Sequence, residues 1–351
     1  MINIMKKFKK KQTKFKKIIP FLLIGLLSSI VFSGLTHCYL SFIPKATFNA
    51  PHILHIPKKS SVHDIAILLK KKQLIHSVNY FKLISKTTKK DHLFKAGYFN
   101  IPKSTNQHNL IYILTTQYGN HNLVKITIPE GFSIAEIATR LEKNKICLSQ
   151  EFEQYCHTQA KSDFKSTFTF LTDIPLTTIE GYLFPETYFF KHNESIPTIV
   201  KTMLTQFKKQ IYTPYKTSDK TYKYSFHQLT TLASMIQKES RINSEMPRIS
   251  SVFYNRLKKR MRLESDPTVV YALGKTYKDK VYYKDLETKS PYNTYRVGGF
   301  PPTPIASPGT KAFKAALNPE TTPYLFFVAQ KNGYHHFTKT YKEHLAIQRK
   351  K

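Results

Sequence analysis

The sequence predicts an α+β protein that carries an N-terminal transmembrane helix. A strand followed by a helix is repeated at residues 56–69 and 128–141. Helical stripes of apolar residues run through 227–259, and short β-type runs follow at 325–329 and 336–337. Short strands mixed with longer helices are typical of the α+β class. The chain has 351 residues, which is enough for two or three domains.

The N-terminal segment predicts a membrane anchor. Residues 1–17 form a basic tail with eight lysines and no acid, and residues 18–43 contain no Asp, Glu, Lys or Arg. About 20 apolar residues span a bilayer as a helix, and basic residues on one side favour a cytoplasmic N-terminus. We expect a single-pass protein of the cell (inner) membrane whose remaining chain lies outside the cytoplasm. The alternative is a cleaved signal peptide, whose apolar core has only about 7–15 residues, and it also implies export.

The charge of the chain bears on its partners. The formal charge is +33, from 55 basic and 22 acidic residues. Three explanations of this positive charge compete. They are nucleic-acid binding, attraction to an anionic polymer or membrane surface, and a plain excess of exposed lysines without a function. Export and the lack of a nucleic-acid-binding motif argue against nucleic acid. A wall polymer that bears peptide carboxylates matches the charge. Cys147 and Cys156 are close enough in sequence to pair, and their spacing leaves a disulfide open.

The internal repeat predicts two related strand–helix modules. Residues 56–66 align with residues 128–138, and each copy has an Ile-Pro step at the end of its strand. Each copy then has a Ser three residues before an acid, which is a capping-box pattern. The pairs are Ser61 with Asp64 and Ser133 with Glu136. A partial third copy spans 101–114. We assign 44–125 to a first module and 126–220 to the second repeat and a middle region. The modules resemble LysM-type carbohydrate-binding domains, and a spacer role is the alternative.

The middle region contains an unusual segment. Residues 179–188 read IEGYLFPETY, which combines aromatic, proline and acidic residues. We expect this segment to form a sugar-contacting wall with Glu180 and Glu186.

One glutamate has the position expected of a general acid. From His227 onward, apolar residues form a helical stripe that ends at Leu232 and Ile236. Glu239 follows Leu232 by seven residues, which returns it to within ~20° of the same direction. The carboxyl should therefore face the apolar interior, where burial raises the pKa as an acid catalyst requires. The alternative is a carboxylate at a helix end that pairs with Lys238 or Arg241.

A second helix at about 246–259 is followed by loops rich in Asn, Tyr, Ser and Pro, at 261–269, 290–295 and 299–305. Tyr and Asn side chains suit sugars, which offer flat faces and many hydroxyls, although each residue taken singly also fits ordinary turn chemistry. The candidate substrate contacts are Ser240, Asn255, Asp266, Tyr292 and Asn293, together with Glu180 and Glu186.

These motifs resemble a known family. LASMIQKES at 232–240, VFYNRL at 252–257, SDPTV at 265–269, YNTY at 292–295 and FPP at 300–302 look like the endolytic murein transglycosylases of the MltG (YceG-like) family. The order of anchor, LysM-like region and catalytic domain (221–351) also fits. The catalytic Glu of the family matches Glu239. Many relatives carry a second Glu where this chain has Gln237, so that position should not be essential.

The resemblance implies a lyase that acts on peptidoglycan glycan strands without a cofactor or a metal. It implies cleavage within the strand and a 1,6-anhydro product. It further implies a role in ending strand elongation beside peptidoglycan synthases. The residues leave two alternatives open. A lysozyme-like hydrolase would use Glu180, Glu186 or Asp266 as a second carboxylate, and a wall-binding protein would use Glu239 only structurally.

Overall fold

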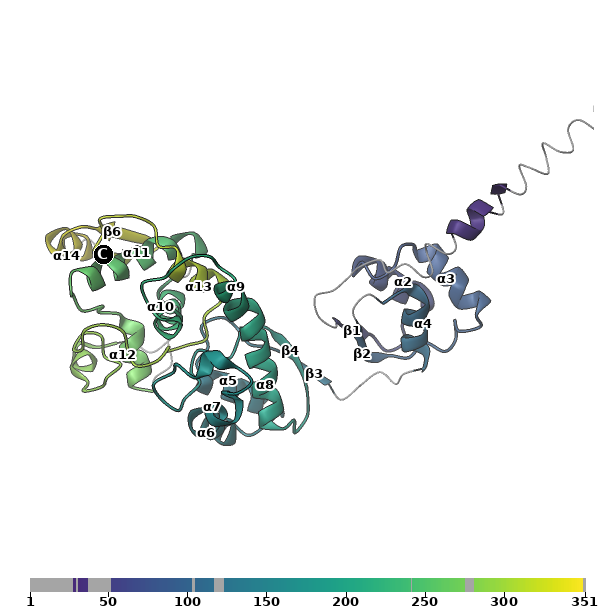
Figure 1. The fold of residues 1–351 in the computed structure, drawn as a ribbon, viewed down its shortest axis with the longest axis horizontal. Coiled ribbons are helices and arrows are strands. Elements are labelled where there is room, and N and C mark those ends of the chain that lie inside the picture. The colour runs from purple at the N-terminus through teal and green to yellow at the C-terminus, as the bar shows by residue number, and fades with distance from the viewer. Residues whose placement is uncertain are drawn as a thin grey trace, which may run out of the picture. The chain divides into compact units, whose positions relative to one another are not determined.

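The structure is a computed structural model that describes residues 28–29, 31–36, 52–102, 105–116, 123–240, 242–274 and 281–349 (Figure 1). The chain divides into two compact units, Met1–Leu123 and Val124–Lys351. The predicted basic tail and most of the predicted span at 18–43 lie outside the described residues. Within the described ranges, no helix combines the length and the apolar character needed to cross a membrane.

The first unit is a small α+β module. Strands β1 (His52–Ile56) and β2 (Gly97–Ile101) pair antiparallel, with Leu54 opposite Phe99. Helices α2 (Val62–Lys71), α3 (Val78–Thr87) and α4 (Gln107–Thr116) complete the unit. Alternate strand residues are buried because one face of the hairpin meets the helices. The core consists of Leu54, Ile56, Ile65, Leu69, Phe81, Phe99, Ile101, Leu110 and Leu114, with their neighbours.

The second repeat belongs to the other unit. Strand β3 (Leu123–Thr127) leads into α5 (Ile134–Lys143), and β3 pairs with β4 (Thr187–Lys191). The predicted capping boxes are confirmed at both repeats: the hydroxyl of Ser61 caps α2, and that of Ser133 caps α5. The two copies thus share a local structure although they lie in different units.

The middle region is mostly helical. It contains α6 (Ser149–Thr158), α7 (Ala160–Phe164), a 3₁₀ turn (Thr169–Leu171) and α8 (Ile196–Phe207). A π-helical turn (Lys208–Tyr212) and α9 (Thr213–Lys216) continue from α8. The segment at 179–185 is buried between these helices, so its aromatic residues do not form the predicted wall. Tyr182 stacks on Phe170 at 5.8 Å, and its hydroxyl lies 2.9 Å from Nδ1 of His227.

The C-terminal part surrounds one buried helix. Helix α10 (Phe226–Glu239) packs against α11 (Met246–Lys258), α12 (Asp266–Ala272) and α13 (Thr310–Leu317) (Figure 1). The 3₁₀ turns Asn243–Glu245 and Tyr283–Glu287 connect this part. The β5 (Phe326–Ala329) and β6 (His335–Thr338) hairpin and α14 (Tyr341–Gln348) end the chain.

A glycine lets two segments of this core approach closely. Gly181 has a φ of +85°, and a Cβ there would lie 2.2 Å from Cβ of Pro304. Only a residue without a side chain fits this contact. It fixes the 302–307 loop against the buried middle segment.

Candidate active site

Glu239 is the last residue of α10, and its carboxyl is enclosed. Leu232 and Ile236, the apolar residues that define its direction in the helix, are fully buried. Although Glu239 keeps some surface exposure as a whole residue, burial of its carboxyl raises the pKa to about 7. A hydrogen bond from Ser265 opposes this rise, the charge of Asp266 adds to it, and Arg256 opposes it weakly. The group is therefore a proton donor near neutral pH.

The alternative in which the Glu239 carboxylate forms an ion pair with Lys238 is not observed. The Lys238 ammonium donates to the carbonyl oxygen of Gly131 at 3.1 Å and lies 3.9 Å from Oε2 of Glu136. Arg241, the other expected partner, lies outside the described residues. What touches the carboxyl instead is a hydroxyl: Oγ of Ser265 donates to Oε1 of Glu239 at 2.5 Å.

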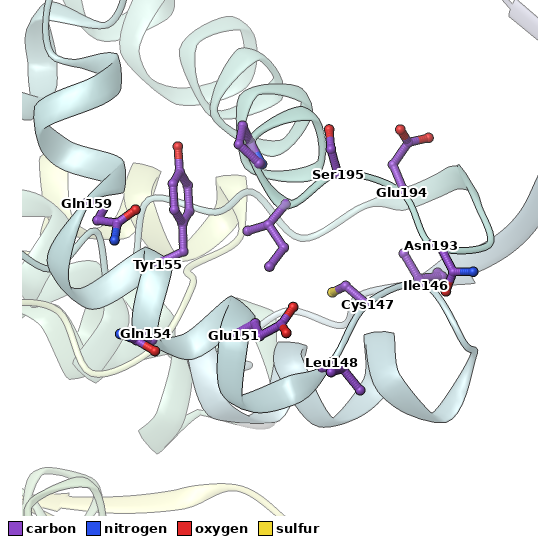
Figure 2. Close-up of a pocket in the computed structure, with 12 residues that line it drawn as sticks. Ile146, Cys147, Leu148, Glu151, Gln154, Tyr155, Gln159, Asn193, Glu194 and Ser195 are labelled. Atoms are coloured by element: carbon purple, nitrogen blue, oxygen red, sulfur yellow. The ribbon is translucent and has the colours of Figure 1, made fainter.

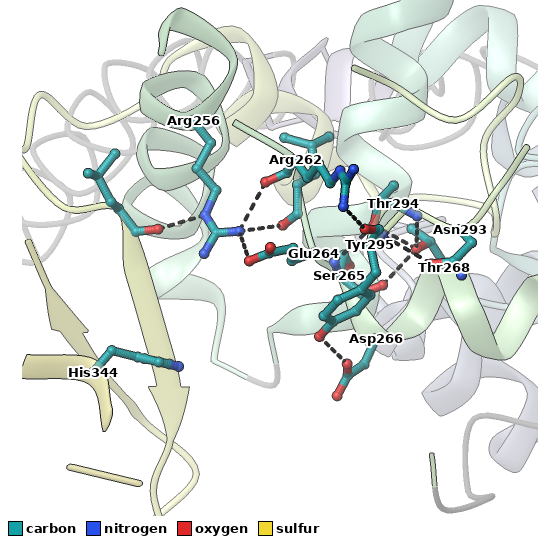
Figure 3. Close-up of polar contacts among 12 residues, drawn as sticks. Arg256, Arg262, Glu264, Ser265, Asp266, Thr268, Asn293, Thr294, Tyr295 and His344 are labelled. Carbon is teal, nitrogen blue, oxygen red and sulfur yellow. Dashed lines mark hydrogen bonds and ion pairs between the residues drawn. The ribbon is translucent and has the colours of Figure 1, made fainter. Parts of the chain in front are cut away.

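Ser265 is held by a buried cluster of hydroxyl groups. Its backbone N–H donates to Oγ1 of Thr294 at 2.9 Å, and its carbonyl accepts from Oγ1 of Thr268 at 2.7 Å (Figure 3). The hydroxyls of Thr268 and Thr294 lie 2.8 Å apart. All three residues are buried. These bonds fix the backbone of Ser265, and its hydroxyl in turn orients the Glu239 carboxyl.

The turn before Ser265 is clasped by a buried guanidinium. Arg256 donates to the carbonyls of Arg262 and Leu263, each at 3.1 Å, and to the Glu264 carboxylate at 2.9 Å (Figure 3). Its Nε donates to the carbonyl of Leu325 at 2.7 Å. The backbone of Glu264 has a φ of 48°, a strained value for a residue with a side chain. The Arg256 contacts stabilise that turn and so the approach of Ser265.

The exposed Asp266 and the half-buried Tyr295 form a polar pair beside the acid. The Tyr295 hydroxyl donates to Oδ1 of Asp266 at 2.6 Å. Burial, followed by the charge of Asp266, raises the pKa of Tyr295 well above its usual value, so the hydroxyl keeps its proton. Asp266 is exposed at the first position of α12. Among the predicted substrate contacts, it is the one whose charge acts on Glu239.

Three other predicted contacts are used inside the protein. Glu180 is 1% exposed and accepts from the N–H of Ile134 at 3.1 Å and from the hydroxyl of Tyr271 at 3.2 Å. Asn293 is fully buried and donates to two loop carbonyls, each at 2.8 Å. Asn255 donates to the carbonyls at 322 and 324. Their amides and carboxyl face protein backbone, so these positions do not support direct contact with a substrate.

The remaining predicted residues also have hydrogen-bond partners within the protein. Ser240 is buried and donates to the carbonyl of Ile242 at 2.7 Å. Tyr292 is partly buried, and its hydroxyl lies 2.8 Å from Oγ1 of Thr303. Glu186 is exposed next to β4 and accepts from the N–H of Thr187.

The start of the second repeat forms one side of the site. Gly131 receives the Lys238 bond and donates its N–H to the carbonyl of Ser307 at 2.8 Å. Oε1 of Gln237 accepts from the N–H of Gly309 at 3.0 Å. Gly309 also lies against the carboxylate of Glu130, where a Cβ would find no room. The last turn of α10 is thereby fixed to both loops.

Residue-type reasoning missed Ser265, Arg256 and the two glycines. Ser265 precedes an Asp-Pro step that begins a helix, so its sequence position is that of an ordinary N-cap residue. The sequence does not indicate that its hydroxyl contacts a carboxyl far away in the chain. Arg256 lies in a helix beside the apolar Leu257, and residue type alone favours an exposed side chain for an arginine. Its buried guanidinium could be found only from the carbonyls that it meets.

The thiols and histidines have no evident part in this site. Cys147 and Cys156 are both free thiols. Cys147 lies in a groove of about 630 Å³ between α6 and the start of α8, together with Glu151 and Glu194 (Figure 2). Nδ1 of His335 lies 3.0 Å from Glu245. In the part of the chain that the structure describes, no three His, Cys, Asp or Glu residues are grouped as metal ligands would be.

Fold and site together define a mixed α/β protein built around one desolvated acid at a helix end. The YceG-like family model matches residues 54–350, and the chain belongs to this family. It is 41% identical over 301 residues to the endolytic murein transglycosylase of Bacillus subtilis (strain 168), covering 83% of this chain and 82% of that protein. The endolytic murein transglycosylase of Streptococcus pneumoniae serotype 2 (strain D39 / NCTC 7466) is 29% identical over 338 residues, covering 89% of this chain and 60% of that protein.

A crystal structure of a yceG-like protein from Listeria monocytogenes is similar in fold. The two chains share 32% sequence identity with a TM-score of 0.56, and the similarity covers 86% of this chain and 100% of that one. The mixed α/β fold is therefore the YceG-like fold.

Proposed function

We propose that this protein is an endolytic peptidoglycan lytic transglycosylase, a lyase that cuts glycan strands between MurNAc and GlcNAc. The named relatives and the family support the reaction class. The observation that carries the proposal is the Glu239 carboxyl, enclosed at a helix end with a pKa of about 7. Such a group is present in both protonation states near neutral pH, so it can give a proton and later take one.

In the proposed mechanism, Glu239 performs both proton transfers. Its carboxyl protonates the glycosidic oxygen as the bond to C1 of MurNAc breaks. The resulting carboxylate then takes the proton of the MurNAc C6 hydroxyl, whose oxygen attacks C1 and closes the 1,6-anhydro ring. Ser265 holds the carboxyl through its hydroxyl, and burial, with a smaller contribution from the charge of Asp266, keeps the pKa of Glu239 high. The reaction needs no water and no second carboxylate.

The alternative within enzymes is a lysozyme-like hydrolase, which needs a second carboxylate to activate water or attack the sugar. Asp266 is the remaining candidate beside Glu239, and its Oδ1 is already occupied by the hydroxyl of Tyr295. Glu180 is enclosed among backbone donors, and Glu186 is bonded to its own strand. The relatives named as transglycosylases favour an enzyme over a purely wall-binding protein.

The setting of the enzyme is part of the proposal. Residues 18–43 would anchor the chain in the cell membrane, with the basic tail 1–17 in the cytoplasm and the rest outside it. The first unit would be a LysM-like module that binds glycan. Cutting nascent strands beside peptidoglycan synthases would end their elongation.

The test uses the full chain in detergent micelles with uncrosslinked glycan strands, and mass spectrometry identifies the products. We expect anhydro ends, which lack one water relative to hydrolysis, and no cutting by Glu239→Gln. Glu151→Gln, on an exposed face of α6, serves as the matched control and should cut normally. Reducing ends would establish the hydrolase instead, and an active Glu239→Gln protein would remove Glu239 from the mechanism.

A further inference from the structure

We propose that a cationic groove along α5 binds the carboxylate-bearing peptides that branch from peptidoglycan strands, which rests on the proposed function and specifies its substrate. The α5 groove has a volume of about 580 Å³ and lies within the second unit. Its wall includes Lys125, Thr127, Phe132, Glu136, Arg140 and Lys143.

Arg140, which lines this groove, is held in position by two contacts. Its Nη1 donates to the carbonyl of Thr127 at 2.8 Å, and its guanidinium lies 4.6 Å from the ring centre of Phe132. A guanidinium has five N–H donors in a planar fork that matches a carboxylate, and the Thr127 bond uses one of them. Because the side chain is already ordered, binding an anion there costs little further conformational entropy.

The net charge of the residues that line the α5 groove is positive, and the lysine excess of the whole chain does not by itself explain it. Lys125 and Lys143 are exposed at its wall. Its acid, Glu136, accepts from the N–H of Ser133 at 2.8 Å and lies 3.9 Å from the Lys238 ammonium, so its charge is largely compensated.

The groove between α6 and α8 gives the contrast. It is of similar size, yet Glu151 and Glu194 line it and no Lys or Arg does (Figure 2). A uniform excess of lysine would make both grooves positive. The positive charge of the α5 groove is therefore a local property.

The groove begins where the catalytic helix ends. Lys238 directly precedes Glu239 and joins both Gly131 and Glu136, at the start of α5. From Glu136 to Lys143 the helix advances about 10 Å, and three extended peptide residues span about the same length. A strand whose sugar lies at Glu239 can therefore lay a neighbouring peptide along α5.

The experiment measures binding separately from cutting. Full-length Glu239→Gln protein in micelles is titrated with labelled glycan strands that keep their peptides, and with the same strands after enzymatic removal of the peptides. We expect at least threefold tighter binding of the peptide-bearing strands at about 0.15 M salt. Adding Lys125→Gln and Lys143→Gln should remove most of this preference, as should adding Arg140→Gln alone. The matched control adds Lys201→Gln and Lys209→Gln, two exposed lysines of which one lies in α8 and the other in the π-helical turn, and it should keep the preference.

Equal binding of the two strand types, or a preference that survives the Lys125 and Lys143 changes, would overturn the groove assignment. Since these exposed lysines lie on the surface, their replacement leaves the fold intact even if Arg140→Gln weakens it. Cutting by the wild-type protein is scored in parallel. Failure to cut would refute the enzyme and leave the binding result readable, whereas normal cutting without a peptide preference would refute only the groove.

Discussion

Replacing Ser265 with alanine should shift the pH dependence of cutting toward higher pH. The Ser265 hydroxyl donates to Glu239 at 2.5 Å and lowers a pKa that burial has raised to about 7. A hydrogen bond to a charged group contributes about 1.5–3 kcal/mol, and 1.36 kcal/mol corresponds to one pKa unit. Because the Glu239 residue is partly exposed, we take the lower part of this range. Without the hydroxyl the carboxylate loses stabilisation, so its pKa should rise by roughly one unit.

The assay follows the initial rate of anhydro-product formation from about pH 5 to pH 9. Cutting needs protonated Glu239, so the rate falls as pH rises through its pKa. In Ser265→Ala this falling limb should move up by roughly one unit, with a lower plateau because the carboxyl is less well oriented. Ser251→Ala is the control, since its hydroxyl donates to the carbonyl of Arg248. A falling limb that stays in place or moves to lower pH would show that Ser265 does not tune Glu239.

Two further changes test the enclosed polar groups. Burial raises the pKa of Glu180 to about 7, so the proton stabilises the folded state, and this stability is lost as pH rises through 7. Relative to Glu180→Gln, the wild-type protein should lose up to about 3 kcal/mol of unfolding free energy between pH 4.5 and pH 8. Urea unfolding measures this difference. If the unfolding free energies of the two proteins changed in parallel with pH, the reasoning would be contradicted. Asn293→Ala removes two hydrogen bonds of 2.8 Å to the carbonyls of Leu286 and Thr288. This change should cost about 1–3 kcal/mol of unfolding free energy. A variant that is equally stable but has a raised KM would instead indicate that Asn293 contacts the substrate.

Local patterns in the sequence were enough to find the repeats and the helix that ends at Glu239. The helix caps at Ser61 and Ser133 follow from a three-residue spacing, which involves neighbours in sequence. The direction of Glu239 follows from helical phase relative to Leu232. Each of these inferences needs only the geometry of one helix, so tertiary contacts could not overturn it.

The functions of the other polar residues depended on distant partners. An Asn in a loop can bond a sugar or a backbone carbonyl with the same atoms, and Asn293 and Asn255 do the second. The IEGYLFPETY segment has a sugar-site composition, yet Tyr182 fills the core beside Phe170. Ser265 meets Glu239 although the two residues lie 26 positions apart in the sequence. Sequence spacing carries no information about such contacts.

The two copies of the strand–helix repeat differ in how freely they could be exchanged. The first copy closes its own hairpin core in a separate unit. The second copy is not separate in this way, because the turn at Gly131 is hydrogen-bonded to Lys238 and Ser307. A chimaera that replaces residues 52–116 with an unrelated small domain should keep a working active site. One that replaces residues 124–144 removes the turn that holds the end of α10, so the two copies differ in what the chain would lose with them.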